Sequence, residues 1–237
     1  MGIEAIEDSS RTRVAVAPAW HTIAVLLLML GVSLVGARVE LPTIFGSHGR
    51  VPRYLLAMLI EWATVAFIWW GLSRRGIRLS DLIGGSWARR LYVLRDIGIG
   101  IAFVVVFGFG LTQVISYLLH VVQPPAVRAM MPQTPLERGV WILLSLTGGF
   151  CEEVIFRGYL QRQFSVLTRS IIGGIVLQAI AFGLSHGYQG WKLMSVIAVY
   201  GASFGCLAHW RRSLRPGMLG HALQDTTVGL LARTLLH

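Results

Sequence analysis

Long apolar stretches alternate with short polar loops along the whole chain. Because the hydrocarbon core of a bilayer is about 30 Å thick, a helix needs about 20 apolar residues to cross it. Stretches close to this length lie at residues 20–37, 54–72, 97–122, 140–160, 171–186, 193–210 and 218–236. The pattern predicts an all-α, polytopic membrane helix bundle with about seven transmembrane helices. A count of six or eight is also compatible, since the stretches at 140–160 and 171–186 contain polar residues.

The first apolar stretch is predicted to be an uncleaved helix and not a secretory signal. Its apolar run is longer than the core of a typical signal peptide, and Glu4, Glu7 and Asp8 spoil the basic segment that should precede it. The loops at 46–52 and 124–135 contain Pro and Gly and are predicted connectors. With no internal repeat and no soluble segment, residues 1–237 are predicted to form one transmembrane domain.

The composition excludes an ordinary soluble domain. Of the 237 residues, 54% are hydrophobic and 14% are charged, whereas soluble domains are about 45–50% apolar and about 25% charged. The net charge is +10, from 21 Lys and Arg against 11 Asp and Glu. In a soluble protein this excess would suggest nucleic-acid binding, but in a membrane protein it is typical of cytoplasmic loops beside anionic lipid. We expect the lipid bilayer, and no nucleic acid, as a partner.

Basic residues are distributed unequally between the two sides of the predicted membrane. The richer side holds Arg11, Arg13, Arg74, Arg75, Arg78, Arg89, Arg90, Arg95, Arg162, Arg169, Arg211, Arg212 and Arg215. The other side holds Arg38, Arg50, Arg53, Arg128, Arg138 and Lys192. The positive-inside rule then predicts an integral protein of the plasma membrane with a cytoplasmic N-terminus and an external C-terminus. An error of one in the span count would reverse the C-terminal half.

Ionisable side chains within the apolar stretches are costly in lipid, so each suggests a function. Before residue 150 the clearest is Glu61, which we expect to neutralise an arginine of another helix and to have no catalytic role. After residue 150 such side chains cluster, as Glu152, Glu153, Arg157, His186, His221 and Asp225.

The spacing of the first three predicts two different environments for adjacent glutamates. On a helix, Glu153 and Arg157 are four residues apart and share a face, where they can form an ion pair. Glu152 is rotated from Glu153 by about 100°, so it need not join that pair. A carboxyl left unpaired in apolar surroundings is suited to act as a general acid or base.

The two histidines extend this constellation to three helices. His221 and Asp225 are four residues apart, and His186 ends its helix one turn after Phe182. Together with Glu152, they could activate a water molecule and stabilise an oxyanion. The alternative interpretations are structural. The acidic and basic residues can form a buried ion network, His186 can cap a helix at the interface, and His221 with Asp225 can join two helices.

At these residues the chain resembles the CPBP family (CAAX proteases and bacteriocin-processing enzymes, also called Abi), a group of intramembrane endopeptidases. Three motifs on separate helices carry the resemblance: E-E-V-I-F-R at 152–157, F-G-L-S-H at 182–186 and H-A-L-Q-D at 221–225. The R-G pair at 157–158 fits the usual continuation of the first motif. The resemblance covers about 140–229, and the first 135 residues are similar only in being membrane helices.

The resemblance implies hydrolysis of peptide bonds in membrane-associated peptide or protein substrates. Glu152 and His186 would activate water, His221 and Asp225 would form the oxyanion site, and Glu153 and Arg157 would hold the first motif in place. Relatives in eukaryotes trim prenylated tails, and bacterial ones include bacteriocin-processing and self-immunity proteins.

Asp225 departs from the family pattern, in which Asn is common at this position. An ionised Asp accepts hydrogen bonds only, so Asp225 would either donate in a protonated form or orient His221. Two histidines and carboxylates could also hold zinc. Because the chain has no H-E-x-x-H helix, we expect no cofactor, no metal site and a metal-independent glutamic mechanism.

Two other classes of function remain open at this point. A non-catalytic membrane scaffold or bacteriocin self-immunity protein could retain the motifs for packing, and a transporter could use intramembrane acids in a proton relay.

The depth of the site residues in the membrane raises a difficulty for the enzyme interpretation. With straight, full-length spans, His221 lies near the cytoplasmic end, His186 near the opposite end and Glu152 between them. They converge only if the helix at 171–186 is tilted, broken or begins later.

Overall fold

A computed structural model describes residues 15–38 and 50–235. These residues form helices, and their one bridge of β type is the isolated pair Gly84 and Ser213. Arg11, Arg13, the acidic residues at 4, 7 and 8, and positions 46–49 of the predicted connector lie outside the described residues. The all-α helix bundle predicted from the apolar stretches is confirmed.

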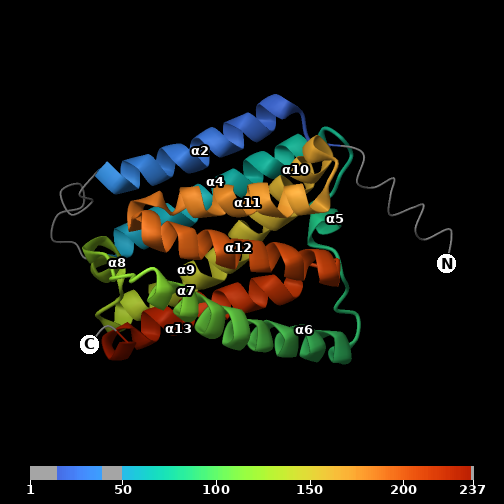
Figure 1. The fold of residues 1–237 in the computed structure, drawn as a ribbon. Helices are drawn as coiled ribbons and strands as arrows, with labels where there is room; N and C mark the ends of the chain where they lie inside the picture. The colour runs from blue at the N-terminus through green and yellow to red at the C-terminus, as the bar shows by residue number, and fades with distance from the viewer. Residues whose placement is uncertain (1–14, 39–49, 236–237) are drawn as a thin grey trace.

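Each of the seven apolar stretches corresponds to a long helical segment within the described residues. In chain order the segments are α2 (Ala19–Arg38), α4 (Val51–Ser73), α6 (Arg90–Phe103) with η1 (Val104–Leu111) and α7 (Thr112–Leu118), α9 (Pro135–Glu152) with η2 (Glu153–Leu160) and α10 (Gln161–Thr168), α11 (Ile171–Ser185), α12 (Trp191–Arg211) and α13 (Arg215–Leu235). Short helices α5 (Leu79–Ile83), α8 (Pro125–Met130) and η3 (Gly187–Gln189) lie in the connections. Figure 1 shows the long helices packed side by side along one direction.

Four of these segments are long and apolar enough to cross a membrane: Val51–Ser73, Arg90–Leu118, Pro135–Thr168 and Trp191–Arg211. Two further apolar helices, Ala19–Val35 and Ile171–Ser185, are shorter. Leucine and valine side chains on the outer faces, including Leu27, Leu59 and Val105, are more than half exposed. Such a large apolar surface is compatible with lipid and not with water. The protein is therefore an integral membrane protein.

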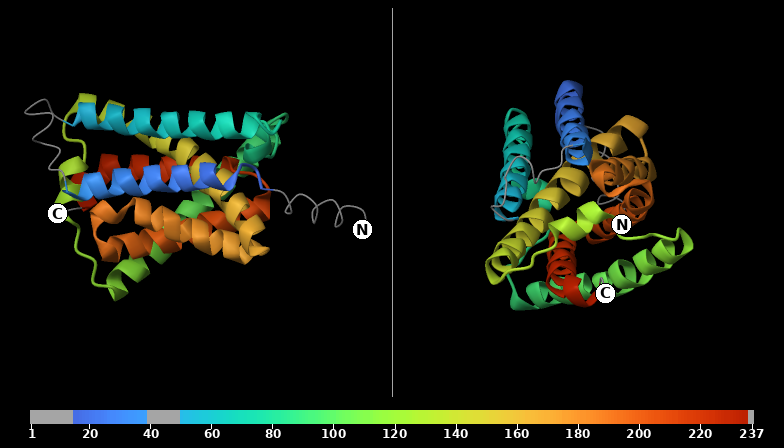
Figure 2. Two further views of the ribbon diagram at one scale, coloured as in Figure 1. Left: turned by 90° about the horizontal axis from the view of Figure 1, so that it is seen from above. Right: turned by 90° about the vertical axis from the view of Figure 1, so that its left-hand side faces the viewer.

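The central segment is the continuous helix from Pro135 to Thr168. Its start is encoded locally, because Thr134 accepts a hydrogen bond from the backbone of Glu137, whose carboxylate accepts one from the Thr134 N–H. Its middle part is a π-helical stretch, η2, in which every residue is buried. Figure 2 shows this segment crossing the bundle at a slant, with the other long helices around it. π-helical turns are frequent at functional sites, and η2 contains the predicted first motif.

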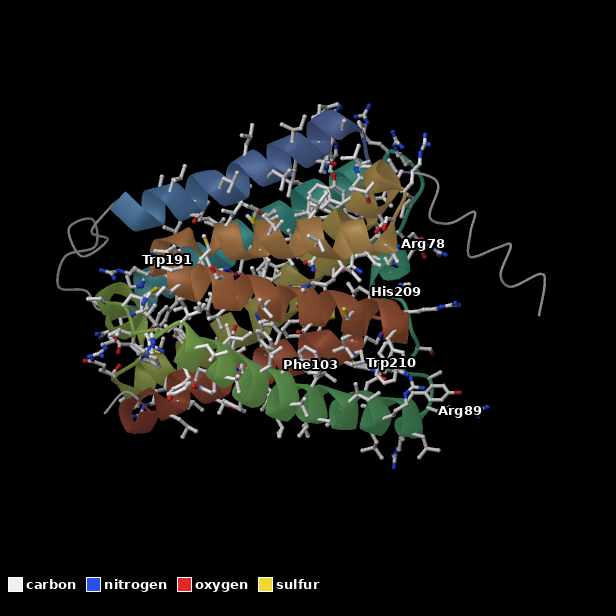
Figure 3. The ribbon with its side chains drawn as sticks, in the orientation of Figure 1. Arg78, Arg89, Phe103, Trp191, His209 and Trp210 are labelled. Atoms are coloured by element: carbon white, nitrogen blue, oxygen red, sulfur yellow. The ribbon has the colours of Figure 1, made fainter. Side chains whose placement is uncertain are left out.

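The two ends of the bundle differ in their side chains. Figure 3 shows Arg78, Arg89, His209 and Trp210 at one end and Trp191 at the other. The loops predicted to be basic thus meet at a common end, as antiparallel helices require. The assignment of that end to the cytoplasm stays a prediction.

Candidate active site

The hairpin of α10 and α11 determines the position of His186. The chain turns at Arg169, which has a left-handed backbone (φ 52°), and Ser170 then caps α11 by accepting a hydrogen bond from the Gly173 N–H. Gly174 lies directly against Ser165, and further along the hairpin the ring of Phe156 contacts that of Phe182 at 4.9 Å. In a pair of antiparallel helices, a residue earlier in the first helix lies beside a residue later in the second helix.

Glu152 and His186 occupy equivalent positions on this hairpin. Glu152 precedes Phe156 by one turn, and His186 follows Phe182 by one turn, so both project beyond the same ring contact. Straight, full-length spans would separate His186 from Glu152, and the structure does not show this separation. The helical segment that contains Glu152 runs on to Thr168, and α11 has only 15 residues, about 22 Å, so it is shorter than a full-length span.

Glu153 and Arg157 form the ion pair that their spacing predicts. Arg157 Nη1 lies 2.9 Å from Glu153 Oε1, and both side chains have no exposed surface. Arg157 Nη2 donates a hydrogen bond to the Gly201 carbonyl at 3.2 Å, and the guanidinium lies 4.2 Å from the ring centre of Phe182. A charged group at this depth needs such compensation, because burial without a partner is costly. The pair joins η2 to α11 and α12.

Glu153 has a second partner that the spacing alone did not indicate. Its Oε1 lies 3.2 Å from His221 Nδ1, across 68 positions in the sequence. A carboxylate can only accept, so Nδ1 of His221 carries the hydrogen of this bond. Close approach of α13 depends on Gly217, since a side-chain carbon there would lie 2.9 Å from Glu153 Oε2. Glu153 therefore links the first motif to the third as well as binding Arg157.

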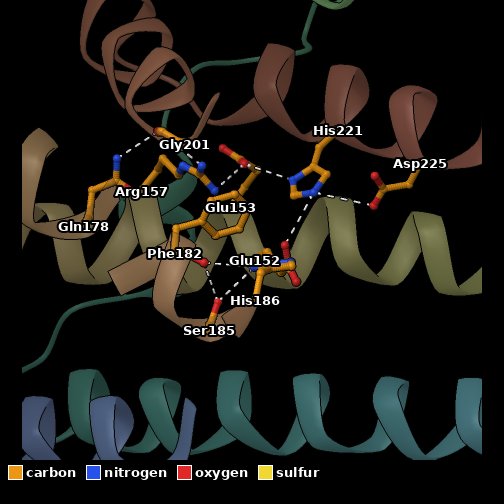
Figure 4. A network of polar contacts seen from close by, with 10 residues as sticks. All are labelled: Glu152, Glu153, Arg157, Gln178, Phe182, Ser185, His186, Gly201, His221 and Asp225. Atoms are coloured by element: carbon orange, nitrogen blue, oxygen red, sulfur yellow. Dashed lines mark hydrogen bonds and ion pairs between the residues drawn. The ribbon is translucent and has the colours of Figure 1, made fainter. Parts of the chain in front are cut away.

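The other nitrogen of His221 faces two more carboxyl groups. Nε2 lies 3.4 Å from Glu152 Oε2 and 3.5 Å from Asp225 Oδ2. Figure 4 shows His221 between Glu152, Glu153 and Asp225, with Arg157 on the side of Glu153 that faces away from His221. The side chains of Glu152 and Asp225 are 19% and 42% exposed, whereas Glu153 is closed off. Among these described side chains, the cluster is thus accessible on the side of Glu152 and Asp225.

His186 belongs to the same cluster through aromatic contacts. Its ring lies 4.8 Å from Phe182, which also contacts His221 at 6.1 Å, and Tyr188 stacks on it at 6.2 Å. Nδ1 of His186 lies 2.9 Å from the Phe182 carbonyl, an acceptor, so Nδ1 carries a hydrogen and Nε2 is the acceptor nitrogen of the neutral imidazole. No hydrogen bond or ion pair joins the described side chains of His186 and Glu152.

Glu61 is the residue whose position the sequence did not indicate. The expected ion pair with an arginine is not found among the described side chains. The two carboxyl oxygens of Glu61 instead lie 4.0 Å from the point where a side-chain carbon of Gly148 would be, and Asp225 Oδ2 lies 3.9 Å from the same point. Glu61 Oε2 is buried and has no hydrogen-bond partner. Only its place within an apolar stretch could have drawn attention to it.

The possibility of a metal site concerns the described side chains only. No group of three His, Cys, Asp or Glu side chains among residues 15–38 and 50–235 has an arrangement that would hold a metal ion. Glu153 forms an ion pair with Arg157 and a hydrogen bond with His221, and Nδ1 of His186 lies within hydrogen-bond distance of the Phe182 carbonyl and the Ser185 hydroxyl.

Comparison with protein families agrees with the motifs. Residues 134–227 match the family model of Rce1-like type II CAAX prenyl endopeptidases. This part of the chain belongs to the CPBP family. The matched region begins at the Thr134 cap of α9 and includes the three motifs, but not α2, α4 or α6. Membership supports a membrane endopeptidase of the CAAX protease type, a hydrolase. No curated protein and no solved structure matches the chain.

Proposed function

We propose that this CPBP-family protein is an intramembrane endopeptidase that hydrolyses peptide bonds of membrane-associated substrates without a metal. The observation that carries the proposal is the meeting of Glu152, His221 and Asp225, from two distant segments, at one partly exposed face. A purely structural ion pair such as Glu153–Arg157 is closed on all sides. The exposed carboxyls of Glu152 and Asp225 are compatible with access by substrate and water.

Water activation is assigned to Glu152 and His186. They lie one turn from the Phe156–Phe182 ring contact, at the end of α9 and the end of α11, and we assign Glu152 the role of a carboxylate and His186 that of a neutral imidazole with Nε2 as acceptor. A water between them would give one proton to this pair while its oxygen attacks the carbonyl carbon. The tetrahedral intermediate then breaks its C–N bond, and the leaving amine takes up the proton. Water and one peptide bond are consumed, and a carboxylate and an ammonium group are formed, because the second proton of the water passes from the new carboxyl to the amine.

Stabilisation of the oxyanion is assigned to His221, with Asp225 beside it. In its charged form, His221 donates a hydrogen bond from Nδ1 to Glu153. Its Nε2–H points to the side of the ring on which Glu152 lies. Glu153 holds the imidazole ring in this orientation, as the buried aspartate does for the histidine of a Ser-His-Asp catalytic triad. Asp225 Oδ2 lies 3.5 Å from the same Nε2, which suits a role in orienting the ring.

The test compares Glu152→Gln with wild type in two assays. Purified protein is given a quenched fluorescent peptide with a farnesylated CAAX terminus, because the matched family is named for this substrate class. We expect Glu152→Gln, His186→Ala and His221→Ala to lose at least ~100-fold in rate. His209→Ala, at an exposed helix end, is the matched control and should retain wild-type activity.

The second assay addresses substrates without a prenyl group. Membrane proteomes of cells that express wild type or Glu152→Gln are compared for a protein that accumulates uncut in the variant. If the three site variants keep full activity and no substrate accumulates, the enzyme interpretation is wrong. The motifs would then serve a non-catalytic scaffold or self-immunity protein, in which the buried Arg157 network holds the helices together.

A further inference from the structure

Glu61 lies in α4, which precedes the part of the sequence that matches the family, and its carboxyl group lies beside the site. Its carboxyl oxygens and Asp225 Oδ2 border the same small space, which exists because residue 148 is glycine. The Glu61 carboxyl and the Asp225 carboxyl therefore lie near each other beside Gly148, and Asp225 in turn contacts His221. Glu61 Oε2 makes no hydrogen bond in the described structure.

A count of charges shows what state Glu61 must adopt. The site contains four carboxyl groups, on Glu61, Glu152, Glu153 and Asp225. Its one permanent cation, Arg157, is paired with Glu153 at 2.9 Å. Even if both imidazoles were protonated, one carboxylate would be left without a counter-charge, and with His186 neutral, as in the proposed mechanism, two would be left. An unbalanced charge at this depth is costly, and Glu61 is the carboxyl with no cation in contact.

We infer that Glu61 is a further catalytic residue: a neutral carboxylic acid that donates a hydrogen bond into the space over Gly148, to the carbonyl oxygen of the substrate. An ionised Asp225 can only accept, so His221 alone would donate to the developing oxyanion. Glu61 supplies the second donor from α4. A neutral buried carboxylic acid is an effective donor of this kind. The catalytic role of Glu61 rests on the proposed endopeptidase function. The protonated state of Glu61 is independent of that function.

The protonated state is tested by infrared spectroscopy of the purified full-length protein in lipid nanodiscs. A carboxylic acid has a carbonyl stretching band separate from the bands of carboxylates and amides. We expect this band in wild type, its loss in Glu61→Gln, and its retention in Asp225→Asn and in the exposed control Asp81→Asn. A wild-type spectrum without the band, or a band that survives in Glu61→Gln, overturns the inference whatever the protein's activity.

The donor role is tested by the peptide cleavage assay. Glu61→Ala removes the donor and should reduce kcat by about 100-fold or more, the usual cost of one oxyanion donor. Glu61→Gln keeps an N–H donor of similar shape and should lose less than about 10-fold. Asp225→Asn, combined with Glu61→Ala, supplies an amide donor from position 225 and should recover at least about 10-fold.

The two hypotheses fail in different ways. If Glu152→Gln abolishes cleavage but Glu61→Ala and Glu61→Gln behave alike, the role of Glu61 as a donor is wrong and the endopeptidase function stands. If no site variant affects cleavage, the proposed function fails, and the infrared band still decides whether Glu61 is protonated.

Discussion

Replacement of Arg157 by methionine should strongly destabilise the bundle. Methionine fills a similar volume without charge, so the change leaves the buried Glu153 carboxylate without its cation. It also removes the hydrogen bond to the Gly201 carbonyl and the contacts with the rings of Phe182 and Phe204. The effect should therefore be much larger than the loss of an exposed ion pair.

The magnitude follows from burial. Removal of one partner from a buried pair costs about 3–5 kcal/mol, whereas an exposed pair contributes about 0–1 kcal/mol. The cation–π contacts contribute about 0.5–2 kcal/mol each but are not additive with the ion pair. We expect a loss of about 4 kcal/mol in the free energy of unfolding. The additional change Glu153→Gln removes the orphaned charge and should recover about 1 kcal/mol or more.

The measurement is reversible unfolding in mixed detergent micelles, followed by far-ultraviolet circular dichroism. Arg89→Met, at an exposed position, is the matched control and should be within about 0.5 kcal/mol of wild type. A loss below about 1 kcal/mol for Arg157→Met would refute the reasoning, because it would mean that water reaches the pair and screens it.

Three further predictions address packing, orientation and metal dependence. Gly149→Ala should separate α9 from α13 and reduce cleavage, because the new methyl group would lie 2.8 Å from the Ala222 backbone nitrogen. The control Gly98→Ala, whose methyl group would meet no atom within 4 Å, should leave activity unchanged. Equal activity of the two variants would contradict the close contact between α9 and α13. Single cysteines that replace Arg78 and Trp191, in a cysteine-free background, should react with a membrane-impermeant maleimide from opposite sides of the membrane. We expect position 78 to react from the cytoplasmic side and position 191 from the external side, and labelling of position 78 from outside would overturn the predicted orientation. Treatment with 1,10-phenanthroline should not affect peptide cleavage, whereas complete inhibition that zinc reverses would show a metal-dependent mechanism.

Local features of the site were predictable because they depend on helix geometry alone. The pair of Glu153 and Arg157 follows from a separation of four residues on one helix face. The start of α9 at Pro135, five residues before the apolar stretch at 140–160, could also have been predicted, since Thr134 and Glu137 form a capping box. The apolar stretches placed the long helices, although the central one extends to Thr168.

The sequence by itself determined that the chain forms apolar helices and that its rare charges gather in three short motifs. Only the tertiary structure decided which of these charges meet. The bond of Glu153 to His221, the position of His186 near the first motif and the position of Glu61 near Asp225 depend on the slant of the central helix, the short α11 and close approach at glycines. Helix periodicity is a property of neighbouring residues, so the sequence contains it. Contacts between distant residues result from the packing of whole helices, which no local pattern specifies.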